Sequence, residues 1–353
     1  MSDPLRTRFC ALVGCELPVV QTGMGWVSGA SLTAATSAAG GFGILAAVTM
    51  TPEQLLVAVR KVKDRTDRPF GVNFRADQPD LEERVAFVVS EGVRLVSFAG
   101  APTKGAVARC HDAGVLVMPT VGARRHAEKV LEMGVDAVIA QGGEGGGHTG
   151  VVPTTLLLPA VVDAVGASIP VLAAGGFFDG RGLVAALAYG ADGIAMGTRF
   201  LLTAESHVPA GVKVLYVAAT PTDTVVTTAL DGAPQRVIRT EVVDRIERSP
   251  KLLRFPRAAA AALRFRKETG TSFAALVKEG LAMKRNQDLT WSQVALAANA
   301  PMLIKATMVD GRPEVGILPS GQVAGVIDEL PTVAELLARI RTDAELTLKR
   351  LGG

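Results

Sequence analysis

Short apolar segments alternate with longer amphipathic segments along the chain as far as Phe200. The short segments are apolar on both faces and are bounded by Gly, Pro or Asp, which is typical of buried parallel strands. We therefore predict eight strands, at residues 18–21, 43–47, 70–74, 94–98, 115–120, 137–141, 171–175 and 193–197.

Helix signals occupy the segments between these strands. Thr51, Pro52 and Gln54 supply an N-cap, a proline at the first helical position and a capping-box partner, and apolar residues follow at helical spacing. A helix is also predicted over 180–189, with Gly190 at its C-terminal end. Repeated strand–helix steps favour a closed (β/α)8 TIM barrel in the α/β class, with an open doubly wound sheet as the alternative.

The pattern changes after the barrel segment. Residues 224–243 resemble a strand or a hairpin with an Asp-Gly turn, and 251–300 resemble helices rich in Arg, Lys and Ala. Residues 320–340 resemble an amphipathic helix that packs back on the barrel. We therefore expect three units: the barrel at 1–205, a smaller, mainly helical substrate-side subdomain at 206–319, and C-terminal helices at 320–353.

The segment AQGGEGGGHTG (140–150) follows a predicted buried strand and contains the first candidates for catalysis. Active sites of TIM barrels lie at the carboxyl ends of the strands, so His148 is interpreted as a functional side chain. Glu144 is a second candidate, although it could equally well pin the loop. Gly146 and Gly147 allow the backbone to approach a ligand closely.

The last two predicted strands also end in turns of small residues, VLAAGGFFDGRG (171–182) and GIAMGTRF (193–200). Backbone amides at such turns bind anions, and barrels commonly hold a phosphate with the loops after strands seven and eight. We therefore predict a phosphate site at these turns, formed by Gly175, Gly176, Ala195, Met196, Gly197 and Thr198.

The first predicted strand opens into QTGMGWVSG (21–29), where Gly23 and Gly25 bracket Met24 and would let main chain lie along a flat ring. Trp26 beside them is a candidate for the substrate side of the pocket. Asn73, at the end of FGVNF, could bind a ring edge or cap the next turn.

A dinucleotide-binding fingerprint is a competing interpretation. GFGILA (41–46) matches the loose form GxGxxA, but a helical segment precedes it and strand-like residues follow, which is the reverse of the required context.

Composition narrows the class of protein. The 353 residues are 48% hydrophobic and carry a formal net charge of +3, which argues against a nucleic-acid partner. Three cysteines without a CxxC pair, no apolar leader and no long apolar run predict a cytoplasmic protein with no metal site and no membrane partner. Arg264 and Arg266 belong to a basic run that is either a solvated helical face or a contact for the phosphates of a CoA substrate.

Taken in this order, these motifs resemble the nitronate monooxygenase (2-nitropropane dioxygenase-like) family, whose pattern FMN-dependent enoyl-[acyl-carrier-protein] reductases share. The resemblance covers most of the chain and implies a barrel that binds FMN. It places the active-site histidine of the family at His148. It places the family's phosphate and ring contacts at Met24, Asn73, Gln141, Gly146, Gly176, Ala195, Met196, Gly197 and Thr198.

Two departures from the family pattern refine this resemblance. Gly23 stands where a proline is usual, and Gly145 stands where alanine is common. Together with the basic helices, these two departures make the chain most similar to one group of family members. That group acts on CoA thioesters of hydroxy-methyl-oxo-hydrindane carboxylates in steroid breakdown. The resemblance therefore implies FMN-dependent α,β-dehydrogenation of a bulky acyl-CoA, with His148 as the base and Glu144 orienting it.

Three other functions remain open at this point. They are oxidation of alkyl nitronates with oxygen, NAD(P)H-dependent reduction of enoyl thioesters, and flavin binding without catalysis. Barrels of this kind often pair, so a homodimer is expected.

Overall fold

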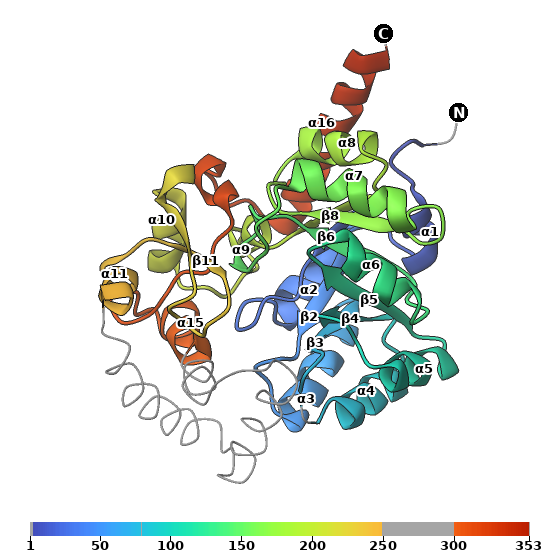
Figure 1. Ribbon diagram of the computed structural model, residues 1–353, viewed down its shortest axis with the longest axis horizontal. Coiled ribbons are helices and arrows are strands. Elements are labelled where there is room, and N and C mark those ends of the chain that lie inside the picture. Colours follow the sequence, from blue (N-terminus) through green and yellow to red (C-terminus); the bar gives the residue numbers. More distant parts are fainter. Residues whose placement is uncertain (1–2, 79, 249–299, 353) are drawn as a thin grey trace.

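The computed structural model describes residues 3–78, 80–248 and 300–352. Eight parallel strands form a barrel, of which Figure 1 labels β2 to β6 and β8. The barrel is closed because the last strand, β9, pairs with the first, β1. The closed barrel and all eight predicted strands are confirmed, and the open sheet is excluded. The barrel strands are β1 (Val19–Gln21), β2 (Phe42–Ala46), β3 (Gly71–Arg75), β4 (Leu95–Ala99), β5 (Leu116–Val121), β6 (Val138–Gln141), β8 (Val171–Ala174) and β9 (Gly193–Met196).

Helices surround the barrel. The capping box predicted at the start of α3 is present, because Gln54 N donates to Thr51 Oγ1 at 3.3 Å and Thr51 N donates to Gln54 Oε1 at 2.9 Å. The segment GFGILA lies mostly in β2, which rules out the dinucleotide fingerprint. The surrounding helices are α2 (Ala30–Ala38), α3 (Pro52–Lys63), α4 (Leu81–Ser90), α5 (Lys104–Asp112), α6 (Arg124–Leu131), α7 (Thr154–Val165), α8 (Gly180–Ala188) and α9 (Thr198–Leu201).

The core has two parts. Side chains that point inward fill the barrel, and the outward side chains of the same strands pack against the helices. The short helix α1 (Arg8–Val13) contributes Phe9 to the inner part, where its ring meets Phe42 edge-on with centroids 6.0 Å apart. The barrel is therefore a filled core, and its chemistry must lie in the loops at its ends.

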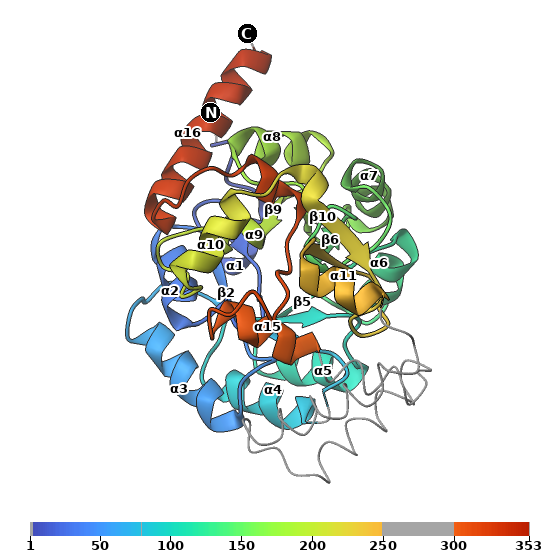
Figure 2. The same cartoon turned by 90° about the vertical axis from the view of Figure 1, so that its left-hand side faces the viewer.

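An accessory unit follows the barrel strands. Its helices and strands are α10 (Ala210–Val217), η1 (Pro221–Asp223), β10 (Thr224–Thr227), β11 (Gln235–Ile238), α11 (Glu241–Arg248) and α15 (Ala300–Met308). The predicted hairpin is confirmed as the antiparallel pair β10–β11. Figures 1 and 2 show these elements together on one side of the barrel. Of the helical segment predicted at 251–300, residues 251–299, which include Arg264 and Arg266, lie outside the described residues.

The hairpin is joined to a barrel loop. The two-residue strand β7 (Gly147–His148) pairs with β11, with Gln235 opposite His148 and Arg236 opposite Gly147. Because β7 follows β6 in the chain, this pairing anchors the accessory unit to the end of the barrel at which the strands finish.

The amphipathic helix predicted over 320–340 begins later than expected. Residues 322–326 form the 3-10 helix η2 (Gln322–Val326), and α16 runs over Val333–Gly352. Pro331 lacks a backbone donor, and Thr332 caps the helix by accepting from Glu335 N at 3.2 Å. The expected start at 320 was therefore wrong. The helix does pack back on the barrel, against α8 (Figure 1).

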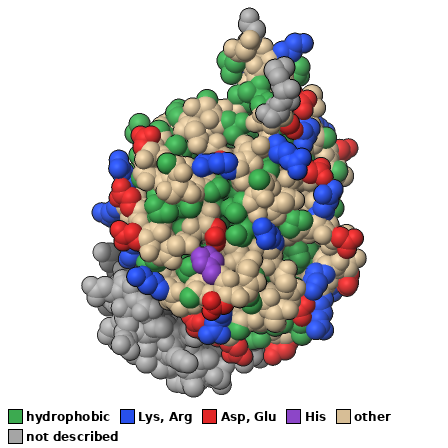
Figure 3. All heavy atoms as spheres, turned by 90° about the vertical axis from the view of Figure 1, so that its right-hand side faces the viewer, with side chains coloured by type: hydrophobic (Ala, Val, Ile, Leu, Met, Phe, Trp, Pro, Cys, Tyr) green, Lys and Arg blue, Asp and Glu red, His purple; other side chains and the backbone are tan. Residues whose placement is uncertain are grey.

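The surface carries charges of both signs. On the face shown in Figure 3, Lys and Arg side chains are mixed with Asp and Glu side chains. Among the described helices, none combines the length and the apolar character needed to cross a bilayer. Cys10, Cys15 and Cys110 are buried free thiols.

Candidate active site

The turns after β8 and β9 present unpaired backbone amides. Gly175 and Gly176 have φ values of +94° and +87°, which glycine adopts without strain. Within the described part of the chain, the backbone N–H groups of Gly176, Gly197 and Thr198 have no acceptor. Unpaired amides of this kind at neighbouring strand ends fit a phosphate group, which accepts hydrogen bonds and carries negative charge.

The loop after β6 lies against these turns. A Cβ placed on Gly176 would come within 3.9 Å of Glu144 Cβ, and one on Gly175 would lie 3.1 Å from Gly145 N. The structure therefore brings together the 141–148 loop and the predicted phosphate turns, although they come from separate parts of the chain.

A third segment completes this region and was not predicted as part of the site. Gly321 N donates to Thr198 Oγ1 at 3.0 Å, and Gln322 N donates to Glu144 O at 3.0 Å. A Cβ on Gly146 would lie 2.4 Å from Gly321 N, so the loop and this segment are in direct backbone contact. The sequence signal for this segment was the pair of glycines in SGQVAGVI (320–327), but these glycines do not reveal which loop they approach.

The loop after β1 contacts the other side of the β9 turn. A Cβ on Gly197 would be 3.3 Å from Met24 Sδ, and a Cβ on Gly23 would be 2.3 Å from Asn73 Cβ. Asn73 is buried, and its Nδ2 donates to Ser97 Oγ on β4 at 3.3 Å. Gly23, Met24, Asn73 and Gly197 thus lie together. Ala195 and Met196 are buried within β9 itself.

Trp26 adopts an unusual backbone conformation two residues after Met24. Its φ is +65°, a left-handed value that costs a non-glycine residue free energy and persists only where the surroundings enforce it. The half-buried indole donates from Nε1 to Pro301 O at 3.1 Å, next to the start of α15. Trp26 therefore connects the loop after β1, in which Gly25 also lies, with the accessory unit.

His148 is accompanied by a carboxylate that the sequence patterns did not reveal. The Nε2 atom of His148 lies 2.8 Å from Oδ2 of Asp231, a residue in the connection between β10 and β11. The side chain of His148 is 66% exposed, whereas that of Asp231 is only 7% exposed. Asp231 was visible in the sequence only as the first residue of the Asp-Gly turn.

Glu144 has a different role from the one expected. Its carboxylate accepts from Thr154 N at 3.0 Å and from Thr154 Oγ1 at 2.7 Å, at the first residue of α7. A negative charge is favourable at a helix N-terminus. The expectation that Glu144 orients His148 is therefore wrong, and the alternative that it pins the loop agrees with these contacts.

Further contacts hold the same loop. Gln141 Nε2 donates to His148 O at 2.8 Å, and the guanidinium of Arg236 donates to Gly143 O at 2.8 and 3.1 Å. Burial lowers the pKa of Arg236, and the negative charge of Glu144 opposes that shift. The histidine thus projects from a loop that is fixed by the barrel and by the hairpin.

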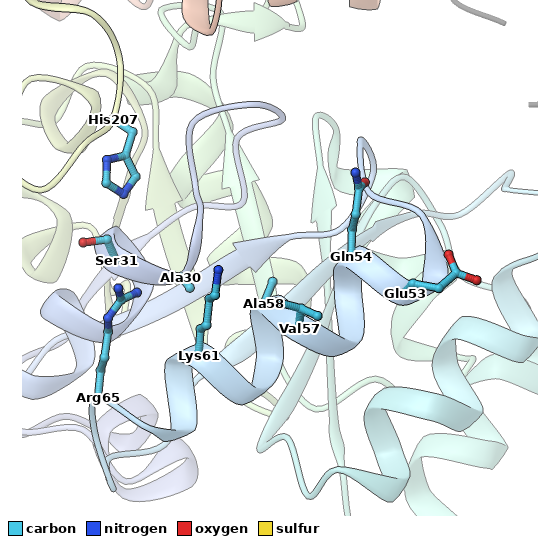
Figure 4. A pocket seen from close by; sticks show the side chains of 9 residues that line it. All are labelled: Ala30, Ser31, Glu53, Gln54, Val57, Ala58, Lys61, Arg65 and His207. Atoms are coloured by element: carbon cyan, nitrogen blue, oxygen red, sulfur yellow. The ribbon is translucent and has the colours of Figure 1, made fainter. Parts of the chain in front are cut away.

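A separate groove of about 490 Å³ lies on the side of the barrel between α2 and α3 (Figure 4). Lys61, Arg65 and His207 are among its lining residues. None of the predicted site residues lines this groove, so it is distinct from the site at the strand ends.

Comparisons with known proteins agree with this arrangement. The family model described as nitronate monooxygenase matches residues 6–86 and 81–343. The chain is 56% identical over 341 residues to a protein of Mycobacterium tuberculosis named (3aS,4S,5R,7aS)-5-hydroxy-7a-methyl-1-oxo-octahydro-1H-indene-4-carboxyl-CoA dehydrogenase, covering 96% of each chain. It is 54% identical to a Rhodococcus jostii protein of the same name, covering 99% of this chain and 98% of that protein.

A solved structure supports the fold at lower identity. The structure of FabK from Thermotoga maritima matches with a TM-score of 0.79 and 34% identity, and the match covers 99% of both chains.

Proposed function

This chain belongs to the nitronate monooxygenase family of flavin-dependent oxidoreductases, and we propose that it dehydrogenates a bulky alicyclic acyl-CoA between its α- and β-carbons, with FMN as cofactor. The substrate class is that of the hydrindane-carboxyl-CoA thioesters named for the two relatives that are more than half identical to it. The proposed place of the reaction is steroid catabolism.

The residues at the strand ends fit a flavin mononucleotide. The unpaired amides of Gly176, Gly197 and Thr198 would hold the phosphate. Met24 lies beside the β9 turn and Asn73 beside Gly23, and both side chains would contact the ring. When bound, FMN supplies the two-electron acceptor for the hydride that leaves the β-carbon.

His148 is the proposed base for the α-proton of the substrate. The thioester carbonyl acidifies this proton, and a neutral imidazole is suited to accept it at cellular pH. The observation that carries the proposal is an exposed imidazole, backed by a buried carboxylate, on the loop that contacts the phosphate turns. Trp26 is proposed to line the substrate side, and Arg264 and Arg266 to meet the CoA phosphates.

The test is anaerobic mixing of the FMN-loaded protein with a hydrindane-carboxyl-CoA, with an alkyl nitronate and with NADPH in separate experiments. Bleaching of the flavin absorbance by the acyl-CoA alone is expected. Reaction with the nitronate and none with the acyl-CoA would instead assign nitronate oxidation, and rapid bleaching by NADPH would assign enoyl-thioester reduction. An FMN-loaded protein that none of the three reduces would be a flavin-binding protein without these activities.

The role of His148 has its own test. We expect His148→Gln to lower the rate of flavin reduction by about 100-fold or more, since positioned acid–base groups contribute roughly 10²–10⁴-fold, while FMN stays bound. His111→Gln is the matched control, because His111 also pairs with a carboxylate, Asp136, at 3.0 Å but lies on α5. Equal rates in the two variants would remove His148 from the mechanism.

A further inference from the structure

We propose that Asp231 is a positioning residue that holds the proton of neutral His148 on Nε2, which makes Nδ1 the basic atom. This inference rests on the proposed role of His148 as the base. It assigns part of the chemistry to the hairpin, which lies outside the barrel.

The hydrogen-bonding capacity of the two side chains determines the tautomer. A carboxylate is only an acceptor, so at 2.8 Å the atom Nε2 of His148 must be the donor. Gln235 Nε2 also lies 3.3 Å from His148 Nε2, but this amide donates to Asp231 Oδ2 as well. If the imidazole nitrogen accepted from Gln235, it would face the carboxylate oxygen with two lone pairs opposed. The charge-assisted bond to Asp231 therefore prevails.

The carboxylate is held independently of the histidine. Ala233 N donates to Asp231 Oδ1 at 3.1 Å, and Gln235 donates to Oδ2. A buried carboxylate needs such partners to offset its lost hydration. Because the β7–β11 register places Gln235 opposite His148, the same strand pairing brings the carboxylate and the ring together.

The other ring nitrogen is available for chemistry. Within residues 3–78, 80–248 and 300–352, Nδ1 of His148 has no hydrogen-bond partner. The nearby charged groups Glu144 and Arg236 are engaged elsewhere, with Thr154 and Gly143 respectively. Asp231 is thus the charged group that contacts the ring.

The amide variant Asp231→Asn should reverse the tautomer. Ala233 N–H must keep an oxygen as its acceptor, so the amide oxygen takes the place of Oδ1 and the NH2 group faces His148. This NH2 group needs an acceptor, and Nε2 of His148, which faces it, provides one when it is unprotonated. The proton then moves to Nδ1, which can no longer accept the proton of the substrate.

The experiment is ¹⁵N NMR of the histidine rings in the FMN-loaded protein, combined with pH–rate profiles. The chain has four histidines, and the spectrum of His148→Gln identifies the signals of His148. The expected result is an Nε2–H tautomer in the wild type, an Nδ1–H tautomer in Asp231→Asn, and a return toward Nε2–H in Asp231→Glu. The kcat of Asp231→Asn should fall about 100-fold, within the range for acid–base groups, with a smaller change in KM.

Asp136→Asn is the matched control, since it should change the signals of His111 and leave those of His148 and kcat unaltered. An Nδ1–H tautomer in the wild type, or an unchanged tautomer and kcat in a folded Asp231→Asn, would overturn the inference. If no acyl-CoA reduces the wild-type flavin, the proposed function fails, whereas the NMR result still decides the tautomer.

Discussion

Replacing Gly146 by alanine should separate the loop after β6 from the 320–322 segment. The added Cβ would lie 2.4 Å from Gly321 N and 2.5 Å from the carbonyl carbon of Ser320, and neither atom can move away as a flexible side chain could. An ordinary contact begins at 3.4 Å, so the two backbones must part by about 1 Å.

The size of the effect follows from the bonds that cross this contact. Gln322 N to Glu144 O and Gly321 N to Thr198 Oγ1 are both 3.0 Å, and a further 1 Å would take them beyond hydrogen-bond range. At about 1 kcal/mol for each bond, the loss is about 2 kcal/mol. For a chain of 353 residues, that corresponds to a fall in Tm of about 3 °C. FMN affinity should weaken about tenfold, the equivalent of 1.4 kcal/mol, because the Thr198 turn shifts.

The assays are thermal unfolding of the apo and FMN-loaded protein and titration of FMN by fluorescence. Gly122→Ala is the matched control, because it follows β5 and an added Cβ there meets nothing within 4 Å. If Gly146→Ala behaves like Gly122→Ala in both assays, the inferred contact is refuted. A lower Tm with unchanged FMN affinity would mean that the contact serves the fold and not the cofactor site.

Two further predictions concern the C-terminal helix and acid stability. Leu337→Ala should lower the free energy of unfolding by about 2–5 kcal/mol, because this side chain is buried against the barrel. Leu346 is 61% exposed on the same helix, so Leu346→Ala should be nearly neutral. Equal losses of stability in thermal unfolding would contradict this packing. Hydrogen bonds from the backbone N–H and the hydroxyl of Thr220 lower the pKa of Asp223 in the folded state. The ionised carboxylate therefore stabilises the fold at pH values above its unfolded pKa of 3.8. This stabilisation is lost as the pH falls through the lower pKa of the folded state. The Tm of Asp223→Asn should therefore lie below that of the wild type at pH 6 and converge with it as the pH falls below 3.8; a difference that does not vary with pH would rule out this linkage.

The barrel and the glycine turns that end its last strands were predictable because their signals are local. Each buried parallel strand is a short apolar run, and each turn carries its own glycines, as at Gly175 and Gly176. The start of α16 was misplaced for a local reason too, since Pro331 and the Thr332 cap override the apolar pattern that begins earlier. Here the pattern located the helix but not its first residue.

The carboxylate partner of His148 was not predictable in the same way. Glu144 lies four residues from His148 and Asp231 lies 83 residues away, so proximity in sequence favours the wrong acid. Glu144 instead accepts a hydrogen bond from Thr154 at the start of α7, where the helix N-terminus stabilises a negative charge. Only the pairing of β11 with β7 brings Asp231 to the ring, and that pairing depends on a long-range register that periodicity does not encode.

This dependence makes the hairpin part of the site. It supplies Asp231 to the imidazole and Arg236 to Gly143 O, and its strand fixes the backbone of His148. The barrel alone would present the phosphate turns and a histidine whose two ring nitrogens are equally free to carry the proton. A relative that keeps the barrel glycines but lacks an acid at the position of Asp231 is thus expected to retain the proposed cofactor site and to lose the inferred tautomer preference. We therefore expect the proposed reaction to depend on the hairpin as well as on the strand ends.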